Sequence, residues 1–247
     1  MGSQEPQTGR RSWGAWLRER VDLDRWIRLV SAPFLYAALD DRLSFRDALQ
    51  KALRKPVPGH ALGSTWCAGG ITLLLFVNQV VTGVLLAVYY KPAAGAAYES
   101  VRFIENEVPV GWLLRQMHAW GANLMVFMLF VHMARVFFNK AYRPPRELTW
   151  MSGGLLLTVT LAFAFTGYLL PWDQLSYWAS TVGSGMAELV PVVGKHVLVM
   201  MRGGEAVSGQ TLSRFFTLHC IVLPWVTVAL VAAHAMLIRR LGISDPL

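Results

Sequence analysis

Four stretches of the chain are apolar over enough residues to cross the hydrocarbon core of a membrane, which takes roughly 20 helical residues. They lie at about 67–90, 113–138, 150–170 and 215–238. Shorter, more polar connections separate them. The pattern predicts an all-α protein whose main part is a membrane-spanning four-helix bundle.

Two further regions carry apolar residues outside these stretches. The connection at 171–213 is too long for a simple turn, and we expect helices that pack on the membrane surface there.

In residues 1–60, tryptophans and apolar residues recur among arginines at near-helical spacing, typical of amphipathic helices that lie in the membrane interface. A second short helix is expected to begin at Ser44, where Asp47 completes a capping box. These patterns predict an N-terminal interfacial region at 1–60, with a solvated basic arm as the alternative, and a four-helix domain at 61–247.

Composition agrees with a membrane location. The chain is 54% hydrophobic and 15% charged, whereas about a quarter of the residues in a soluble domain are charged. The net charge of +8 comes from basic residues that lie beside the apolar stretches, so lipid headgroups are the expected partner and nucleic acid is not. The first thirty residues lack an uninterrupted apolar stretch, and no cleaved secretory signal is expected.

Lysine and arginine near the ends of the membrane stretches predict the orientation. If four helices run up and down, one face receives the basic residues Lys51, Arg54, Lys55, Lys140, Arg143, Arg146, Arg239 and Arg240. The positive-inside rule then places both termini on the cytoplasmic side, or its equivalent. This side is called the negative side below, and the opposite side the positive side.

Four of the six histidines, His118, His132, His219 and His234, fall inside predicted membrane helices. A histidine buried there is unfavourable without a partner, which indicates function, although a bond to a backbone carbonyl is the plain alternative. The intervals of 14 and 15 residues are close to four helical turns, so each pair lies on one face of its helix, about 21 Å apart at 1.5 Å per residue. Facing helices would therefore pair His118 with His219 near the positive side and His132 with His234 near the negative side.

Each histidine pair can fill the two axial positions of a haem iron. Filling both positions leaves none for oxygen, which favours electron transfer. A zinc or copper site would need ligands gathered at one depth with shorter spacings. The spacing therefore predicts two haems stacked across the membrane.

Two arginines and four glycines accompany the histidines. Arg115 and Arg135 lie about one turn from a histidine, where a cation can pair with a haem propionate; the alternative is an arginine that extends to the membrane boundary. The glycines repeat the 14-residue interval on the first and third helices, where a helix surface without side chains suits the broad face of a haem. They are Gly69, Gly83, Gly153 and Gly167. Simple helix packing is the alternative for each glycine.

The chain from about Val57 to Leu247 resembles the cytochrome b family, which includes cytochrome b6 and the N-terminal half of cytochrome b. The resemblance rests on the segments VPGH, WCAGGITLLLFVNQVVTG, GWLLRQMHAW, FVHMARV, PRELTWMSGG, TGYLLPWDQLSYW, TLSRFFTLHCIVLPW and IRRLGISDPL. The PWDQ segment and the histidine spacing are the most specific of these features.

The resemblance implies two haem b groups and a third haem. In the family, the third is a haem c held by one thioether to a cysteine on the negative side, and the matching position here is Cys67. From the residues alone, Cys67 would be a buried apolar cysteine, since no CxxCH segment accompanies it. Cys220 has no such counterpart and is expected to serve packing.

The resemblance also implies electron transfer from quinol to quinone. Phe165, Ala179 and Gly183 match positions that line a quinol pocket near the positive side, and Arg239 matches one near a quinone-reducing site on the negative side. One electron of the quinol would go to a Rieske iron–sulfur protein and the other through the two b haems, coupled to proton translocation. From the residues alone, Phe165 reads equally well as lipid-facing bulk and Arg239 as positive-inside charge.

The resemblance further implies a complex of several subunits. The sequence contains no PEWY segment, which completes the quinol pocket in the family, so a second cytochrome b subunit is expected to supply it, and the chain is not expected to be active alone. A c-type cytochrome or similar acceptor and a dimeric complex are also implied. The long N-terminal region favours a bacterial inner membrane over a thylakoid-type membrane.

Two other functions fit parts of the pattern. A dihaem membrane anchor of a dehydrogenase or hydrogenase would share the four helices, but it would need neither PWDQ nor Cys67. A proton-coupled transporter would use the histidines as a relay, and it would bind no haem.

Overall fold

The computed structural model describes residues 67–242. The predicted interfacial region at 1–60, with its helices and its boundary to the four-helix domain, lies outside these residues. In the described part of the chain every regular element is a helix. Four helical segments are long and apolar enough to cross a membrane: Ala68–Ala87, Gly111–Phe138, Glu147–Tyr168 and Gly209–Leu241. The predicted all-α fold with four membrane helices is therefore confirmed.

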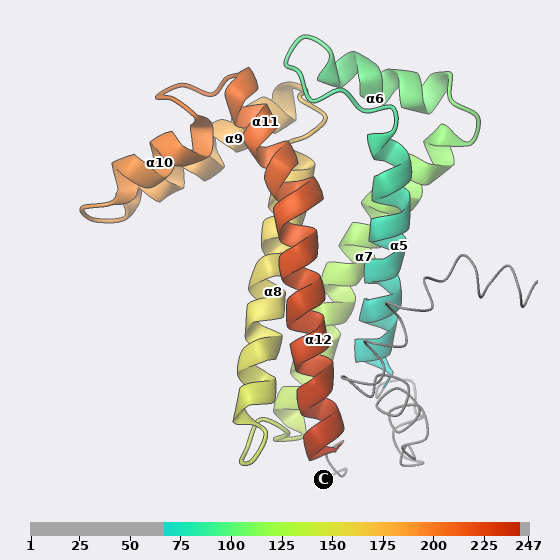
Figure 1. Ribbon diagram of the computed structural model, residues 1–247, viewed down its shortest axis with the longest axis vertical. Coiled ribbons are helices and arrows are strands. Elements are labelled where there is room, and N and C mark those ends of the chain that lie inside the picture. Colours follow the sequence, from blue (N-terminus) through green and yellow to red (C-terminus); the bar gives the residue numbers. More distant parts are fainter. Residues whose placement is uncertain (1–66, 243–247) are drawn as a thin grey trace, which may run out of the picture. The chain divides into compact units, whose positions relative to one another are not determined.

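The four segments associate as two helix pairs. Helix α5 (Ala68–Ala87) packs along α7 (Gly111–Phe138), and α8 (Glu147–Tyr168) packs along α12 (Leu223–Leu241) (Figure 1). Helices α7 and α8 also touch, next to the short turn that joins them. The two pairs are called α5/α7 and α8/α12 below.

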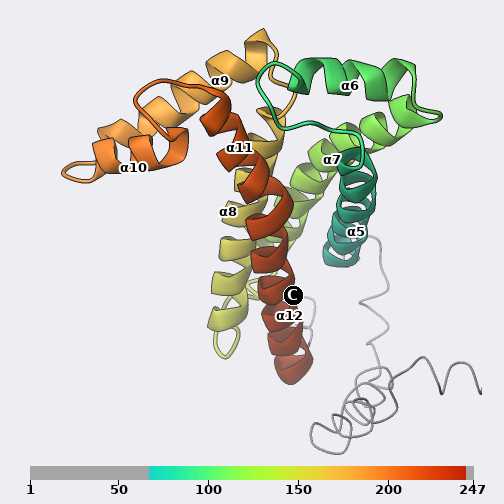
Figure 2. The same ribbon diagram turned by 45° about the horizontal axis from the view of Figure 1, so that its top comes forward.

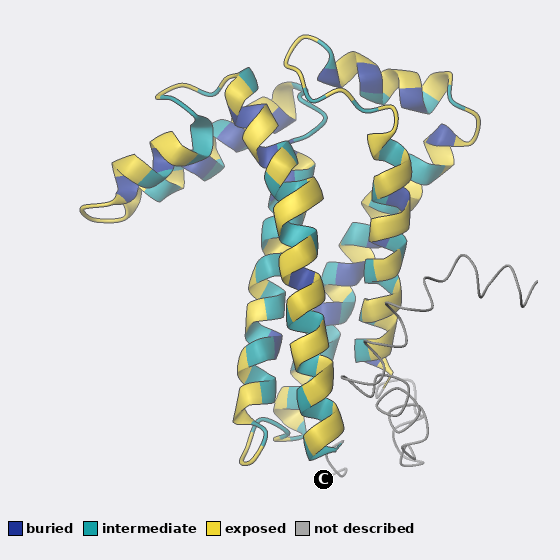
Figure 3. Cartoon of the chain, viewed as in Figure 1, coloured by how far each residue is buried: buried dark blue, intermediate teal, exposed yellow. Residues whose placement is uncertain are grey.

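Burial along the helices is the reverse of that in a soluble bundle. Many large apolar residues of the membrane helices are exposed, and Leu74, Phe127 and Trp225 are 68%, 62% and 73% exposed. Exposed positions predominate along these helices (Figure 3). Buried positions between the helices include Thr82 and Gly153. Lipid is as apolar as leucine, so membrane helices associate through small residues that let their backbones approach. The exposed apolar surface is therefore the surface expected to face lipid.

The first connection contains a helix that the sequence pattern did not indicate. Helix α6 (Ala97–Asn106) is amphipathic and buries Ala97, Ser100 and Ile104. It lies at the end of the bundle where α5 ends and α7 begins, packed against α7 (Figure 2). Its Glu105 pairs with Arg115 of α7.

The long connection at 171–213 is helical, as predicted. It contains α9 (Gln174–Gly185), the 3₁₀ helix η2 (Met186–Leu189), α10 (Gly194–Arg202) and the beginning of the fourth membrane segment, α11 (Gly209–Thr217). Helices α9 and α10 extend beside the bundle at the end where α6 also lies (Figures 1 and 2).

The PWDQ segment turns the chain from α8 onto α9. Trp172 has a φ of 55°, a left-handed conformation that is costly for a residue with a side chain. Asp173 then caps α9, because its Oδ1 accepts a hydrogen bond from the backbone N–H of Ser176 at 2.8 Å. On the far side of the connection, Arg202 donates to Ser184 Oγ at 2.7 Å and to the Thr181 carbonyl at 2.8 Å, so it joins α10 to α9.

Tyr90, just after α5, links the two helix pairs. Its hydroxyl donates to the carbonyl of Leu170 at 2.6 Å, beyond the end of α8, and its ring stacks on Phe216 of α11 with centroids 5.6 Å apart. Burial raises the pKa of Tyr90 above its ordinary value, so the phenol stays protonated and remains a hydrogen-bond donor.

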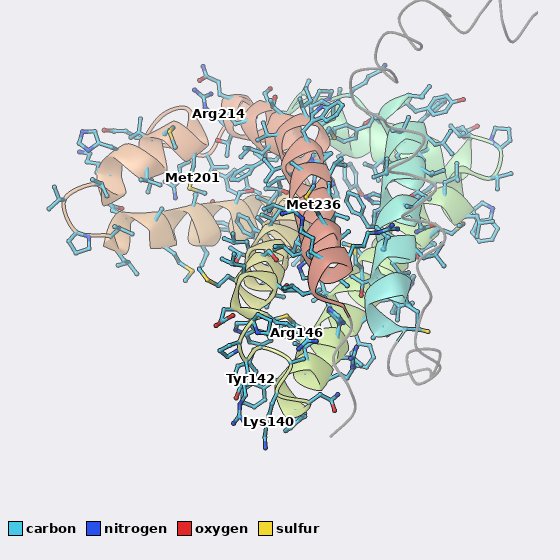
Figure 4. All side chains as sticks on the ribbon, turned by 60° about the horizontal axis from the view of Figure 1, so that its bottom comes forward. Lys140, Tyr142, Arg146, Met201, Arg214 and Met236 are labelled. Atoms are coloured by element: carbon cyan, nitrogen blue, oxygen red, sulfur yellow. The ribbon has the colours of Figure 1, made fainter. Side chains whose placement is uncertain are left out.

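Basic residues mark the opposite end of the bundle. Lys140, Tyr142 and Arg146 lie in and beside the turn between α7 and α8, whereas Arg214 lies on α11, near α10 (Figure 4). Arg239 and Arg240 occupy the last turn of α12, at the same end as the turn between α7 and α8 (Figure 1). The up-and-down arrangement on which the predicted orientation depends is therefore present.

Candidate functional site

The four membrane histidines lie on two of the membrane segments, two on each. His118 and His132 are on α7, and His234 is on α12. His219 lies in η3 (Leu218–Val222), a π-helical turn between α11 and α12. All four side chains are half-buried.

The structure brings the histidines together across the two helix pairs. The ring centroids of His118 and His219 are 6.3 Å apart, with an angle of 72° between the ring planes. His132 and His234 are close enough to interact electrostatically. These are the two pairs that the spacing predicts.

Each histidine packs against a glycine of the other helix in its pair. A methyl group added at Gly69 would lie 3.0 Å from Cε1 of His132, and one at Gly83 would lie 3.2 Å from Cε1 of His118. On α8, the same distance is 3.5 Å from Gly153 to His234 and 2.6 Å from Gly167 to His219. The sequence predicts a bare helix face for a haem at these glycines, and the structure places an imidazole edge against each of them.

Hydroxyl groups hold three of the four imidazoles. Nδ1 of His118 lies 2.9 Å from Thr82 Oγ1, Nδ1 of His219 lies 3.0 Å from Thr166 Oγ1, and Nδ1 of His234 lies 2.8 Å from Ser152 Oγ. Each hydroxyl donates its own hydrogen to a backbone carbonyl of its helix, at Asn78, Ala162 and Thr149 respectively. The oxygen is therefore left to accept a hydrogen bond from Nδ1–H.

This hydrogen-bond pattern assigns the imidazole tautomer. With the proton on Nδ1, the lone pair is on Nε2, which is the nitrogen that a metal ion would bind. A metal-binding histidine usually donates its other ring N–H in this way, which fixes the ring orientation. Hydroxyls of the neighbouring helix thus leave the Nε2 lone pair of three of the four histidines available to a metal ion.

His132 differs from the other three histidines. Its Nδ1 is buried and, within residues 67–242, has no hydrogen-bond partner. The glycine that packs against His132 is Gly69, and the residue before it is Ala68, which has no hydroxyl.

A local break in the fourth membrane segment places His219. Pro224 lacks an N–H and its ring would clash with the carbonyl four residues earlier, at Cys220. The chain widens into the π-helical turn η3 at this point, and such turns are frequent at functional sites. The sequence prediction treats this segment as a regular helix and overlooks the turn, although Pro224 is a visible signal for it.

The donor set and its spacing fit a haem. Two imidazoles that bind one metal ion from opposite sides, each at about 2 Å from nitrogen to metal, would have ring centroids about 6 Å apart, close to the observed 6.3 Å. Within residues 67–242, no group of three or more His, Cys, Asp or Glu side chains is placed to hold a metal ion by itself. The described histidines instead come together two at a time.

The two arginines have different surroundings. Arg115, one turn before His118, forms an ion pair with Glu105 of α6, and both side chains are about one third exposed. Arg135 lies in the last turn of α7, one turn after His132. The predicted contact of each with a haem propionate stays a prediction.

The remaining predicted residues lie at the two ends of the bundle. Gly183 of α9 faces Phe165 of α8, because a methyl group on Gly183 would lie 2.5 Å from the Phe165 ring. Ala179 lies one turn before Gly183 on α9, half-buried. At the other end, Cys67 is exposed at the N-cap of α5, and Arg239 is exposed in the last turn of α12.

The contact between Gly167 and His219 leads to a prediction that distinguishes Gly167 from another glycine of α8, Gly154. We expect Gly167→Ala to displace His219 and to remove or perturb the haem at His118 and His219, because the new methyl group would lie 2.6 Å from Cε1. The matched control is Gly154→Ala in the same helix, where nothing lies within 4 Å of the added methyl group. Haem content and the reduced-minus-oxidised absorption spectrum measure the effect. Equal spectra for the two variants would contradict the role given to this contact.

The chain is similar to known proteins along most of its length. The profile of the family described as cytochrome b/b6/petB matches residues 53–242. Cytochrome b6 of Heliobacterium mobile is 50% identical over 192 residues, which cover 78% of this chain and 90% of that protein. Cytochrome b6 of Synechococcus sp. (strain JA-3-3Ab) is 45% identical over 213 residues, which cover 86% of this chain and 99% of that protein.

A solved structure described as a hyperthermophilic respiratory Complex III is similar in fold. Its TM-score to this chain is 0.73 at 33% sequence identity, over 85% of this chain and 56% of that chain. This chain therefore spans little more than half the length of that one. The match over residues 53–242 and the high identity to near-full-length relatives show that this chain belongs to the cytochrome b/b6 family.

Proposed function

We propose that this chain is the core electron-transfer subunit of a quinol-oxidising complex of the bc or b6f type. It carries electrons across the membrane from the His118/His219 pair, near the positive side, to the His132/His234 pair, near the negative side. The proposal rests mainly on one observation. The four histidines form two pairs, and each pair has one histidine from α7 and one from the fourth membrane segment. Membership of the cytochrome b/b6 family supports it.

The two histidines of each pair would hold the iron of one haem. Iron bound by two imidazoles exchanges single electrons and has no open position for oxygen. The protein contributes orientation, since Gly83 and Gly167 admit the rings of one pair and Thr82 and Thr166 fix their tautomers.

Quinol oxidation is proposed at the end of the bundle where α9 meets α8. Phe165 contacts Gly183 and meets Phe215 edge to face, with centroids 5.8 Å apart. Phe165, Ala179 and Gly183 are half-buried, and we propose that they line the site of a quinol ring. The quinol would give one electron to an iron–sulfur partner and the other to this chain, and its two protons would leave on the positive side.

Quinone reduction is proposed at the opposite end of the bundle, near Cys67 and Arg239. Cys67 is exposed at the start of α5, and a thioether to a haem c is proposed there. Arg239 lies at the end of α12, where a cation also interacts favourably with the helix dipole. Proton uptake there and release at the positive side would couple electron transfer to proton translocation.

The proposed partners follow from family membership. They are a second cytochrome b subunit that supplies a PEWY segment, a Rieske iron–sulfur protein, and a c-type cytochrome or similar acceptor, in a dimeric complex. The four apolar helices support an integral membrane location. We propose a bacterial inner membrane. Basic residues gather at the end of the bundle that holds the turn between α7 and α8 and the last turn of α12, and we propose that this end and both termini face the cytoplasm.

Family membership favours this function over both alternatives. A dihaem anchor of a dehydrogenase or hydrogenase would not require the family's PWDQ segment, which here builds the turn onto α9. A transporter that relays protons would require neither the close pairing of His118 with His219 nor membership of the cytochrome b/b6 family.

The first test removes one ligand from the negative-side pair. We expect His132→Ala and His234→Ala each to lose one of the two extractable b haems, because iron held by one imidazole is bound less tightly. Pyridine haemochrome spectra of the purified complex give the count. The matched control is His196→Ala, which removes an exposed histidine of α10 and should leave both haems in place. Retention of both b haems in His132→Ala would refute the pairing.

A second test addresses covalent attachment. We expect Cys67→Ser to abolish the haem that stays on the chain after acid–acetone extraction, detected by haem staining of a denaturing gel. Cys220→Ser is the control, because Cys220 is the other cysteine of the chain and its side chain is also exposed. Haem retained on the Cys67→Ser chain, or no retained haem on the unsubstituted chain, would contradict attachment at Cys67.

A further inference from the structure

Three of the four histidine–glycine contacts are accompanied by a hydroxyl from the residue directly before the glycine. The hydroxyl residues are Thr82 before Gly83, Ser152 before Gly153 and Thr166 before Gly167. The fourth glycine, Gly69, follows Ala68. In the described part of the chain, Nδ1 of His132 accordingly has no hydrogen-bond partner.

The two histidine pairs therefore differ in their hydrogen bonding. Both members of the His118/His219 pair donate to a threonine, at 2.9 and 3.0 Å. In the His132/His234 pair only His234 donates, to Ser152 at 2.8 Å. The first pair has two such bonds and the second has one.

A hydrogen bond from Nδ1–H makes an imidazole a more basic ligand at Nε2. Ferric iron carries one more positive charge than ferrous iron, so a more basic ligand stabilises the ferric form more. The reduction potential of the bound iron then falls, as hydrogen bonding around the ligands of a haem is known to adjust it. More bonds of this kind at one site therefore mean a lower potential at that site.

We propose that Thr82, Thr166 and Ser152 are positioning residues that lower the reduction potential of the iron bound by their histidines, and that Ala68 leaves the His132 site without this effect. The inference rests on the proposed function, because it needs haem at both pairs. Its direction agrees with that function, since electrons move spontaneously from the site of lower potential to the site of higher potential.

The hydroxyl groups of Thr82 and Thr166 are buried, so water cannot readily take their place as hydrogen-bond acceptors. Thr82 and Thr166 are only 2% and 4% exposed. Their own hydrogens are bound to carbonyls at 2.6 and 2.8 Å, so each oxygen has a fixed direction toward its histidine. Valine has nearly the shape of threonine, and Thr→Val removes the acceptor while leaving the packing almost unchanged.

The missing hydroxyl can be introduced at Ala68. A methyl group on Gly69 would lie 3.0 Å from Cε1 and 3.3 Å from Nδ1 of His132, and one on Gly167 would lie 2.6 and 3.2 Å from the same atoms of His219. The same imidazole edge thus faces both glycines. A serine at 68 is therefore placed as Thr166 is placed for His219.

Redox titration of the purified complex, with the two b haems resolved by their absorption bands, tests the inference. We expect Thr82→Val and Thr166→Val each to raise the potential of the His118/His219 haem, and Ala68→Ser to lower that of the His132/His234 haem. The expected effect is about tenfold in the ferric-to-ferrous equilibrium, or about 59 mV for a one-electron couple. In each variant the potential of the other haem should stay unchanged.

The control and the rescue variant make the outcome decisive. Thr158→Val removes an exposed hydroxyl of α8 that bonds only the Gly154 carbonyl and should shift neither potential. Thr82→Ser keeps the hydroxyl acceptor, so the haem at His118 and His219 should have the same potential as in the unsubstituted complex. This comparison applies even if Thr82→Val binds no haem at that site. Unchanged potentials in haem-loaded Thr82→Val and Ala68→Ser, equal shifts with Thr158→Val, or no rescue by serine would overturn the inference. Absence of both b haems from the unsubstituted complex would refute the proposed function instead.

Discussion

The contact between an imidazole edge and a glycine of the neighbouring helix is the constraint on which this structure depends. It is repeated four times, at Gly69, Gly83, Gly153 and Gly167, and each time a methyl group would lie within 3.5 Å of the ring. Helices in lipid gain little from burying apolar side chains, so close approach through small residues is what holds them together. The same contact therefore brings neighbouring helices together and orients a histidine.

Because the contact is repeated at a 14-residue interval, the bundle has two equivalent levels. Four turns of helix separate them by about 21 Å, and each level receives one histidine from α7 and one from the fourth membrane segment. The levels differ in their hydroxyls, with two at one level and one at the other. A nearly symmetric scaffold can in this way hold two similar groups with different properties.

The ends of the bundle carry the remaining chemistry. At one end α6 lies beside the start of α7, α9 and α10 extend from the end of α8, and Tyr90 links the two helix pairs there. At the other end lie Cys67, the turn between α7 and α8, and the basic end of α12. The proposed electron transfer along the bundle would therefore connect two chemically different surfaces.

Much of this could be predicted from sequence, because membrane helices and histidine intervals depend on simple periodicity. The four membrane spans, and the pairing of His118 and His132 with histidines of the fourth segment, can be predicted from the rise of a helix and the direction of each segment. The π-helical turn at His219 was missed because it results from a local clash at Pro224.

Two other features depend on tertiary contacts. Helix α6 is only ten residues long, so the ion pair of Arg115 with Glu105 could not be anticipated. The role of Thr82 was invisible because a threonine in a helix commonly bonds its own backbone, and its second bond depends on the neighbouring helix.

The most direct test of the account is the number of haem groups that acid–acetone extracts per chain from the purified complex. Two histidine pairs, each closing both axial positions of one iron, predict two extractable b haems per chain. One extractable haem, or none, would contradict the pairing of His118 with His219 and of His132 with His234.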